Sequence, residues 1–296
     1  MKVTANGISI EVEDTGESGR PPVLLVMGLG MQLVAWPPAL VQALHDAGFR
    51  VVRFDNRDAG LSRHFPEAGV PNLAWLTLKH RLGFRVQSPY TLGDMARDTA
   101  GVLDALGIPA AHVVGVSMGG MVAQRLAIDA PRRLLSLASI MSSSGARYLP
   151  PPRPHVVQAL LRRPAGRGED AVVDNTMNLL RAIRSPGFPA DEAETRERIL
   201  LAVRRAYNPA GIARQMVAIA ADDTRAGELG RVRAPTLVVH GTDDPLVPFA
   251  CGQDSARRIP GAKLVAIPGM GHDLAPGVVD RIVDVLLPHL RQSAAP

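Results

Sequence analysis

The stretch His112-Val113-Val114-Gly115-Val116-Ser117-Met118-Gly119 decides the fold of this chain. Its first residues are mostly β-branched and apolar, which is typical of a buried strand. After it, apolar residues recur at helical spacing up to Pro131. The serine is therefore expected at a sharp strand-to-helix turn, in a strained backbone conformation that exposes its hydroxyl. The glycines two residues away on either side are needed because such a turn leaves no room for a Cβ atom.

The G-x-S-x-G pattern alone is a weak signal, because a chain of this length contains one by chance in roughly one case in ten. A glycine-rich turn before a helix would give the same letters. A serine hydroxyl is a poor nucleophile until a base removes its proton. The catalytic hypothesis therefore predicts a carboxylate and then a histidine further along the chain, each in a loop after a strand.

Both groups follow in that order. The apolar stretch Pro235–His240 predicts a buried strand, and the turn-rich loop after it contains Asp243 and Asp244. Lys263–Ile267 predicts another strand, which is followed by Pro268-Gly269-Met270-Gly271-His272. The order Ser, Asp, His distinguishes this arrangement from other serine hydrolase folds. The serine is the expected nucleophile, the histidine its base, and an aspartate the group that orients the imidazole.

Together these residues resemble the α/β-hydrolase superfamily over nearly the whole chain. Val23–Gly30 looks like the strand and oxyanion loop that usually contains H-G, with Met27 in place of that histidine. Phe54–Ser62 looks like the superfamily's D-x-R-G-x-G-x-S loop, with Asp58 in place of the first glycine. With the P-G-M-G-H stretch that ends at His272, these variants are most similar to the aclacinomycin methylesterase-like branch.

The resemblance assigns the catalytic acid to Asp244, because the loop fits the superfamily pattern G-x-x-D-x-x-x-P at that residue. Asp243 would then face solvent or cap the turn. Some relatives carry the acid one strand earlier. Here the corresponding strand, Leu134–Ile140, is followed by Met141 and a run of serines without a carboxylate.

Attack on a carbonyl builds negative charge on its oxygen, and removing one hydrogen-bond donor to that oxygen typically costs about 3 kcal/mol in barrier height. One expected donor is the backbone N–H of Met118, at the N-terminus of the helix after the nucleophile. The other, by resemblance, is the N–H of Leu29. The methionine at position 27 removes neither amide, but it changes what can brace the loop.

The rest of the chain predicts an α/β fold with a mostly parallel central sheet and helices on both faces. Val3–Glu13 alternates around Asn6-Gly7, which indicates an antiparallel hairpin. The other predicted strands are Val23–Met27, Val51–Asp55, His112–Val116, Leu134–Ile140, Pro235–His240 and Lys263–Ile267. The predicted helices of this alternating pattern are Pro37–Ala47, Thr91–Leu106, Met118–Asp129, Ala250–Arg258 and Gly277–Leu290.

The alternation stops after the strand that ends at Ile140. Helical patterns without a strand fit Glu169–Arg184, Asp191–Tyr207 and Gly211–Ala221. A helical insertion at this point resembles the superfamily's cap, or lid. The expected domains are a core of residues 1–141 and 233–296 and a cap of residues 142–232.

Several residues are candidates for the substrate pocket. Flexible methionines suit an adaptable apolar pocket, although packing in the core is the alternative for each of them. The pocket candidates are Gly28, Met31, Met141, Met177 and Met216. His64 could also line the pocket, and the connection Gly69–Arg85, whose structure the pattern leaves open, could form part of its mouth.

The composition suits a globular enzyme, with 296 residues of which 46% are hydrophobic. No signal peptide, membrane-length apolar stretch or metal-ligand spacing is visible, and Cys251 is the single cysteine. We therefore expect a cytoplasmic enzyme that needs no cofactor or metal. It would act on a small-molecule ester as a monomer or homodimer, without a nucleic-acid or membrane partner.

Arginine dominates the positive charge of the chain. The net charge is +5, and residues 142–232 hold 14 arginines against 10 acids. A basic segment can bind nucleic acid or an anionic substrate, but no aromatic-rich basic motif accompanies this one. Arg147–Arg167 is also interrupted by prolines. We interpret the excess as a solvated, arginine-rich surface.

These observations predict a carboxylic ester hydrolase that forms an acyl-enzyme on Ser117, which water activated by His272 then releases. The resemblance implies a methyl or other small alkyl ester of a bulky apolar acid. Two alternatives stay open. One is a C–C bond hydrolase or cofactor-free perhydrolase with the same triad, and the other is a non-catalytic ligand receptor on the same fold.

Overall fold

The computed structural model describes residues 1–72, 75, 84, 86–166 and 168–293. Most of the connection Gly69–Arg85 therefore lies outside the described residues, and its expected part in the mouth of the pocket stays a prediction. No helix within the described ranges is long and apolar enough to cross a membrane.

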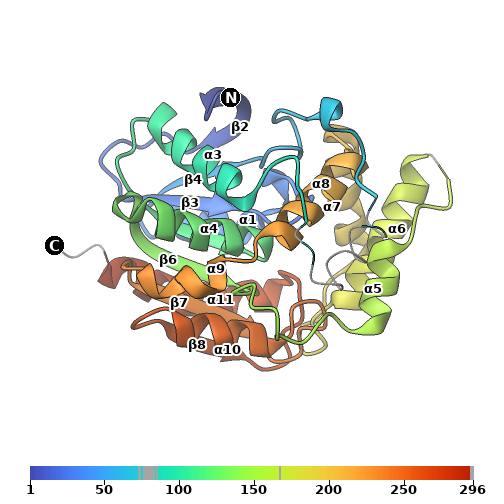
Figure 1. Ribbon diagram of the computed structural model, residues 1–296. Coiled ribbons are helices and arrows are strands. Elements are labelled where there is room, and N and C mark those ends of the chain that lie inside the picture. The colour runs from blue at the N-terminus through green and yellow to red at the C-terminus, as the bar shows by residue number, and fades with distance from the viewer. Residues whose placement is uncertain (73–74, 76–83, 85, 167, 294–296) are drawn as a thin grey trace.

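A single mixed sheet forms the centre of the described chain (Figure 1). Its strands are β1 (Lys2–Ala5), β2 (Ile8–Asp14), β3 (Pro22–Val26), β4 (Arg50–Phe54), β5 (Ala111–Val116), β6 (Leu134–Ile140), β7 (Thr236–Gly241) and β8 (Lys263–Ile267). They lie in the order β1-β2-β4-β3-β5-β6-β7-β8. β1 and β2 are antiparallel, as is the pair β2 and β4, while all neighbours from β4 to β8 are parallel.

Helices cover both faces of this sheet, which confirms the predicted fold class. α3 (Leu92–Ala105) and α4 (Met118–Asp129) pack on one face, with α10 (Phe249–Arg258) beside β7 and β8. α1 (Pro38–Asp46) and α11 (Pro276–Gln292) pack on the other face. The strand order reverses between β3 and β5, and the carboxyl ends of strands at such a switch point are where ligands bind in open α/β sheets.

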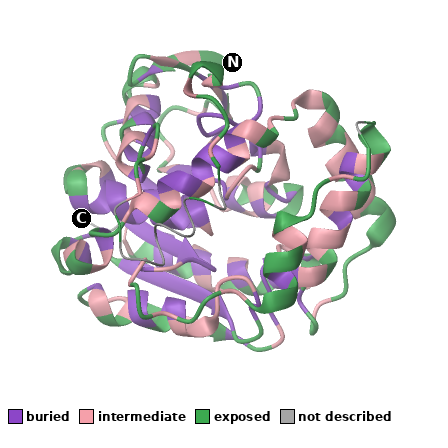
Figure 2. Cartoon of the chain, turned by 45° about the vertical axis from the view of Figure 1, so that its right-hand side comes forward, coloured by how far each residue is buried: buried purple, intermediate pink, exposed green. Residues whose placement is uncertain are grey.

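Two apolar layers fill the space between the sheet and its helices. On β3, Leu24 and Val26 belong to the layer under α3 and α4, whereas Val23 and Leu25 belong to the layer under α1 and α11. Successive strand residues point to opposite faces, so a strand covered on both sides must be apolar throughout. This requirement explains the continuous apolar runs in the sequence. Figure 2 shows the strands and the helix beside them as the main buried part of the molecule.

Between β6 and β7 the described residues form helices and no strand; we call residues 142–232 the insertion. Its helices are α5 (Pro154–Leu161), α6 (Glu169–Ile183), α7 (Glu192–Arg205), α8 (Pro209–Ala221) and α9 (Arg225–Glu228). α5 to α8 lie together on one side of the core (Figure 1). The sequence pattern did not predict α5, because its prolines suggested a broken segment. Pro154 is the first residue of α5, where proline is tolerated since that N–H needs no helical partner.

Two arginines of the insertion are interior residues, so the interpretation of its arginines as a solvated surface is wrong for them. Arg214 and Arg225 are each 1% exposed. Arg225 pairs with Asp222 and donates to the side-chain oxygen of Gln124 and to the carbonyl of Ser143. A buried guanidinium is tolerated when its N–H groups find such acceptors.

Candidate active site

Ser117 occupies the turn between β5 and α4 with φ 54° and ψ −121°. A positive φ is strained for a residue with a Cβ and persists only where the surroundings enforce it. The N–H of Ser117 donates to the carbonyl of Ile140 at 2.9 Å, and Ser142 Oγ donates to the carbonyl of Ser117 at 2.7 Å. The strained strand-to-helix turn that the sequence predicts is therefore present.

The glycines on either side of Ser117 allow backbone segments to touch. A Cβ on Gly115 would lie 2.3 Å from the carbonyl oxygen of Gly119. A Cβ on Gly119 would lie 2.0 Å from the carbonyl oxygen of Val26. Both distances are shorter than a real carbon–oxygen contact, so only glycine fits, and the serine turn packs directly on the carboxyl end of β3.

His272 lies between Ser117 and Asp244. Its Nε2 is 2.9 Å from Ser117 Oγ, and its Nδ1 is 2.7 Å from Asp244 Oδ2. A carboxylate can only accept, so Nδ1 carries the proton and Nε2 is left as the acceptor for the serine hydroxyl. The structure thus brings the three predicted residues together from the loops after β5, β7 and β8.

Several donors hold the buried carboxylate of Asp244. Its Oδ1 accepts the N–H groups of Leu246 at 2.9 Å and Val247 at 2.8 Å. Burial acts to raise the pKa of Asp244. The electrostatic attraction of His272 and hydrogen bonds from His240, His272 and Val247 outweigh burial and hold the pKa of Asp244 well below its ordinary value. The group is therefore an anion at neutral pH, which is what stabilising an imidazolium requires.

Asp243 has a different environment from its neighbour. It is exposed, and its carboxylate accepts the hydroxyl of Thr242 at 2.7 Å and the N–H of Gly269 at 2.9 Å. Asp243 thus joins the loop that carries Asp244 to the loop that carries His272, and it caps the turn at Thr242. Its surroundings agree with the non-catalytic alternative that the sequence pattern assigned to it.

Two backbone N–H groups beside Ser117 are available to a ligand. Gly28 packs on the serine, since a Cβ there would lie 3.3 Å from Ser117 Cβ. In the part of the chain that the structure describes, the N–H groups of Leu29 and Met118 donate to no protein acceptor, whereas that of Gly30 is engaged. Met118 is the first residue of α4, and free donors at a helix N-terminus favour an anion. The geometry is compatible with the predicted oxyanion hole.

The pocket candidates lie at different depths. Gly28 is next to the nucleophile. The exposed fraction is 42% for Met31, 4% for Met177 and 3% for Met141, and Met216 is half-buried. Met141 belongs to the apolar layer under α1 and α11, so its side chain serves the core. A pocket role for the methionines stays a prediction.

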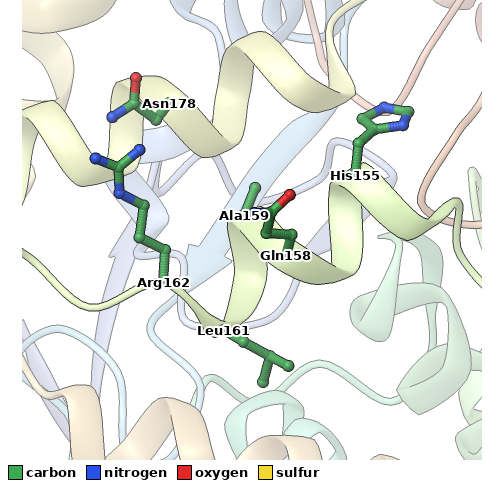
Figure 3. A pocket seen from close by; sticks show the side chains of 6 residues that line it. All are labelled: His155, Gln158, Ala159, Leu161, Arg162 and Asn178. Carbon is green, nitrogen blue, oxygen red and sulfur yellow. The ribbon is translucent and has the colours of Figure 1, made fainter.

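A hollow of about 720 Å³ lies on the insertion (Figure 3). Its lining residues belong to α5, to α6 and to the residue after α5. They are His155, Gln158, Ala159, Leu161, Arg162 and Asn178. None of these six belongs to the predicted substrate pocket, and we assign no function to this hollow.

The sequence pattern did not predict that the insertion holds the histidine loop. The N–H of His272 donates to the carbonyl of Ile183 at 2.7 Å, and the N–H of Gly271 donates to Ser185 Oγ at 2.8 Å. A Cβ on Gly271 would lie 2.5 Å from the carbonyl oxygen of Arg184. The glycine before the histidine is therefore needed for contact with the end of α6.

The aspartate that replaces a glycine of the superfamily pattern also contacts the insertion. Asp58 has a φ of 66°, in the left-handed region that favours glycine. Its two carboxylate oxygens accept hydrogen bonds from Nε and Nη2 of Arg214, each with a nitrogen–oxygen distance of 2.7 Å. Tyr90 and the N–H of Phe65 also donate to it. The strained aspartate thus anchors α8 to the core through a buried, bidentate ion pair.

Replacing Arg214 by leucine is expected to lower the free energy of unfolding by about 3–5 kcal/mol, because Asp58 would be left buried and unpaired. Arg204→Leu is the matched control. Its pair with Glu169 is exposed, and its loss should cost less than about 1 kcal/mol. Urea denaturation of both variants measures the difference. Equal losses would contradict an anchoring role for the buried pair.

A family model described as alpha/beta hydrolase fold matches residues 21–275. The chain belongs to the α/β-hydrolase family. This α/β hydrolase is 30% identical to rhodomycin D methylesterase DauP of a Streptomyces species, over 98% of this chain and 97% of the relative. It is 32% identical to the putative carbamate hydrolase RutD of Variovorax paradoxus, with 89% of each chain covered.

Solved structures agree with this membership. The enol-lactonase from Burkholderia xenovorans matches this α/β hydrolase with a TM-score of 0.71 and 25% identity, over 98% of this chain and 100% of the other. The resemblance that the motifs predicted is confirmed, including the similarity to methylesterases, and so is the prediction that the chain is an enzyme of the serine hydrolase class.

Proposed function

We propose that this α/β hydrolase cleaves carboxylic esters through an acyl-enzyme on Ser117. The observation that carries the proposal is the line of hydrogen bonds from Ser117 Oγ through His272 to Asp244, at 2.9 and 2.7 Å. Oγ attacks the ester carbonyl carbon while Nε2 takes its proton and passes it to the departing alkoxide. The N–H groups of Leu29 and Met118 stabilise the oxyanion.

The second half of the reaction uses the same groups. Water attacks the acyl carbonyl while His272 takes a proton from it. The bond from the acyl carbon to Ser117 Oγ then breaks as His272 returns that proton to Oγ, which releases the acid and restores the serine hydroxyl. Asp244 stays ionised and stabilises the imidazolium in both halves. Every step uses a protein group or water.

The proposed substrate is a methyl or other small alkyl ester of a bulky apolar acid. The methylesterase that is 30% identical over 98% of this chain supports an ester, and the enol-lactonase supports the same bond type, because a lactone is a cyclic ester.

The proposed domain division follows the insertion. We propose that residues 142–232 form a cap over a core of residues 1–141 and 233–296. Two contacts support it, because Ile183 accepts a hydrogen bond from the N–H of His272 and Gln215 accepts one from the N–H of Gly30. Met177 and Met216 are the proposed contributions of the cap to the pocket.

Fluorophosphonate treatment followed by peptide mapping tests the nucleophile. A single adduct on Ser117, with turnover of p-nitrophenyl acetate, is the expected result. Absence of labelling together with absence of turnover for any short aryl ester would favour the ligand receptor instead.

A substrate panel tests the bond that is cleaved. Methyl esters of bulky aromatic acids should show a higher kcat/KM than methyl acetate. The panel also contains an aryl methyl carbamate, because one relative is a putative carbamate hydrolase, and a vinylogous diketone for C–C cleavage. Faster cleavage of either compound than of every ester would reassign the reaction.

A further inference from the structure

We infer that Gln215, in the insertion, is a positioning residue for the oxyanion loop, so that the site is completed only when α8 is docked. The inference rests on the proposed ester hydrolysis and names a part of that machinery which no local sequence motif reveals. The side chain of Gln215 touches the loop and not the nucleophile, and it acts through the backbone of Gly30.

Gln215 is fully buried and makes two hydrogen bonds to the core. Its Oε1 accepts the N–H of Gly30 at 2.8 Å, and its Nε2 donates to the carbonyl of Arg57 at 2.7 Å. One partner is a donor and the other an acceptor, so the amide has a single orientation. The side chain therefore joins the Leu29–Gly30 peptide to the loop after β4.

The oxyanion loop needs an external brace because glycines flank its reacting amide. Gly28 and Gly30 lie on either side of Leu29, and Gly30 has a φ of 67°. Glycine restricts the backbone least, so this segment has more freedom than it would have with side chains at positions 28 and 30. Fixing the N–H of Gly30 fixes the plane of the Leu29–Gly30 peptide, which restricts the backbone of Leu29 and so limits the directions that the N–H of Leu29 can take.

The other end of the loop is held by the core. Asn56 Nδ2 donates to the carbonyl of Met27 at 2.9 Å. The side chain of Met27 itself is buried in the apolar layer and cannot donate a hydrogen bond. The loop is therefore clamped by Asn56 before Leu29 and by Gln215 after it.

α8 is held firmly enough to act as a brace. Arg214, the residue before Gln215, forms the buried ion pair with Asp58, and Asn208 at the start of α8 donates to the carbonyl of Asp58 at 3.0 Å. Ile212 packs on Gly30, since a Cβ on that glycine would lie 2.7 Å from Ile212 Cγ1. Displacement of α8 would therefore release the oxyanion loop as well.

The first test is Gln215→Met, which keeps the length of the side chain and removes both hydrogen bonds. With p-nitrophenyl acetate, kcat should fall about 10- to 100-fold while KM changes less than about threefold, because a misplaced donor weakens the transition state more than substrate binding. Gln32→Met is the matched control. Gln32 is also a buried glutamine that ties the insertion to the core, through the carbonyls of Ala202 and Ala206.

The control separates positioning from general docking of the insertion. Gln32→Met should keep kcat within about threefold of the wild type, with a similar loss of thermal stability to Gln215→Met. Equal losses of kcat in the two variants would overturn the inference. A wild-type kcat in Gln215→Met would overturn it as well.

The second test is Gln215→Glu, which makes the effect on kcat depend on pH. A purely structural role of Gln215 would not produce such a dependence. A carboxyl can still accept from Gly30, but once ionised it cannot donate to Arg57 and it places negative charge close to the oxyanion. The ratio of variant to wild-type kcat should fall as pH rises from 5 to 8. A ratio that does not change with pH would overturn the inference.

The wild-type measurements keep this inference distinct from the proposed function. A wild type that neither labels on Ser117 nor hydrolyses p-nitrophenyl acetate removes the proposed function and the inference together. An active wild type with unchanged Gln215 variants removes the inference alone.

Discussion

Replacement of Ser117 by alanine is expected to reduce kcat for ester hydrolysis by about 10⁴- to 10⁶-fold and to abolish fluorophosphonate labelling. Alanine has no atom that can form the acyl-enzyme, so the remaining rate comes from the oxyanion hole and from substrate binding. The strain at φ 54° would be retained, because alanine also carries a Cβ, and a changed fold is therefore not the expected cause.

Ser136→Ala is the matched control for this loss. Ser136 is a buried serine on β6 whose hydroxyl contacts His112 at 2.8 Å. Its kcat should stay within about threefold of the wild type, since removal of one neutral hydrogen bond costs only about 1 kcal/mol of stability. Substantial turnover by purified Ser117→Ala would show that another group is the nucleophile.

Replacement of Asp244 by asparagine is expected to reduce kcat about 10⁴-fold, whereas Asp243→Asn should cost less than about tenfold. An amide at position 244 lacks the charge that stabilises the imidazolium, and its NH₂ group favours the wrong tautomer of His272. Asp243 holds only a turn, through Thr242 and Gly269. The two variants are well matched, because each removes one negative charge from the same loop.

Steady-state kinetics at pH 8 measures the two losses. The lowered pKa of Asp244 keeps it ionised at this pH and far below it, so protonation of the wild type does not complicate the comparison. Circular dichroism should show that both variants are folded. Equal losses, or a larger loss for Asp243→Asn, would show that the acid has been assigned to the wrong residue.

The strands and the three predicted catalytic residues could be located from the sequence because each has a local signal. A buried parallel strand is a run of apolar residues, and a loop that carries Ser117, Asp244 or His272 follows such a run and contains glycine or proline. The hairpin at Asn6-Gly7 has its own turn signal, and both residues have positive φ. Such local signals can be recognised in the sequence without knowledge of the fold.

Contacts between distant polar residues could not be located in this way. Gln215 and Gly30 are 185 positions apart, and a buried glutamine on a helix has the same letter as an exposed one. Arg214 was included in an apparent surface excess of arginine for the same reason. Only the folded chain shows which polar residues have an interior partner, because such pairs leave no periodic pattern in the sequence.

The helix α5 was not predicted because proline can start a helix as well as interrupt one.

The bond between the N–H of His272 and the carbonyl of Ile183 has a consequence for protein engineering. Exchanging the insertion for that of a relative is an obvious route to a new substrate preference. In this enzyme such a chimera would also replace the segment that supports the histidine loop. A productive graft therefore has to retain the end of α6, and specificity cannot be transplanted as an independent module.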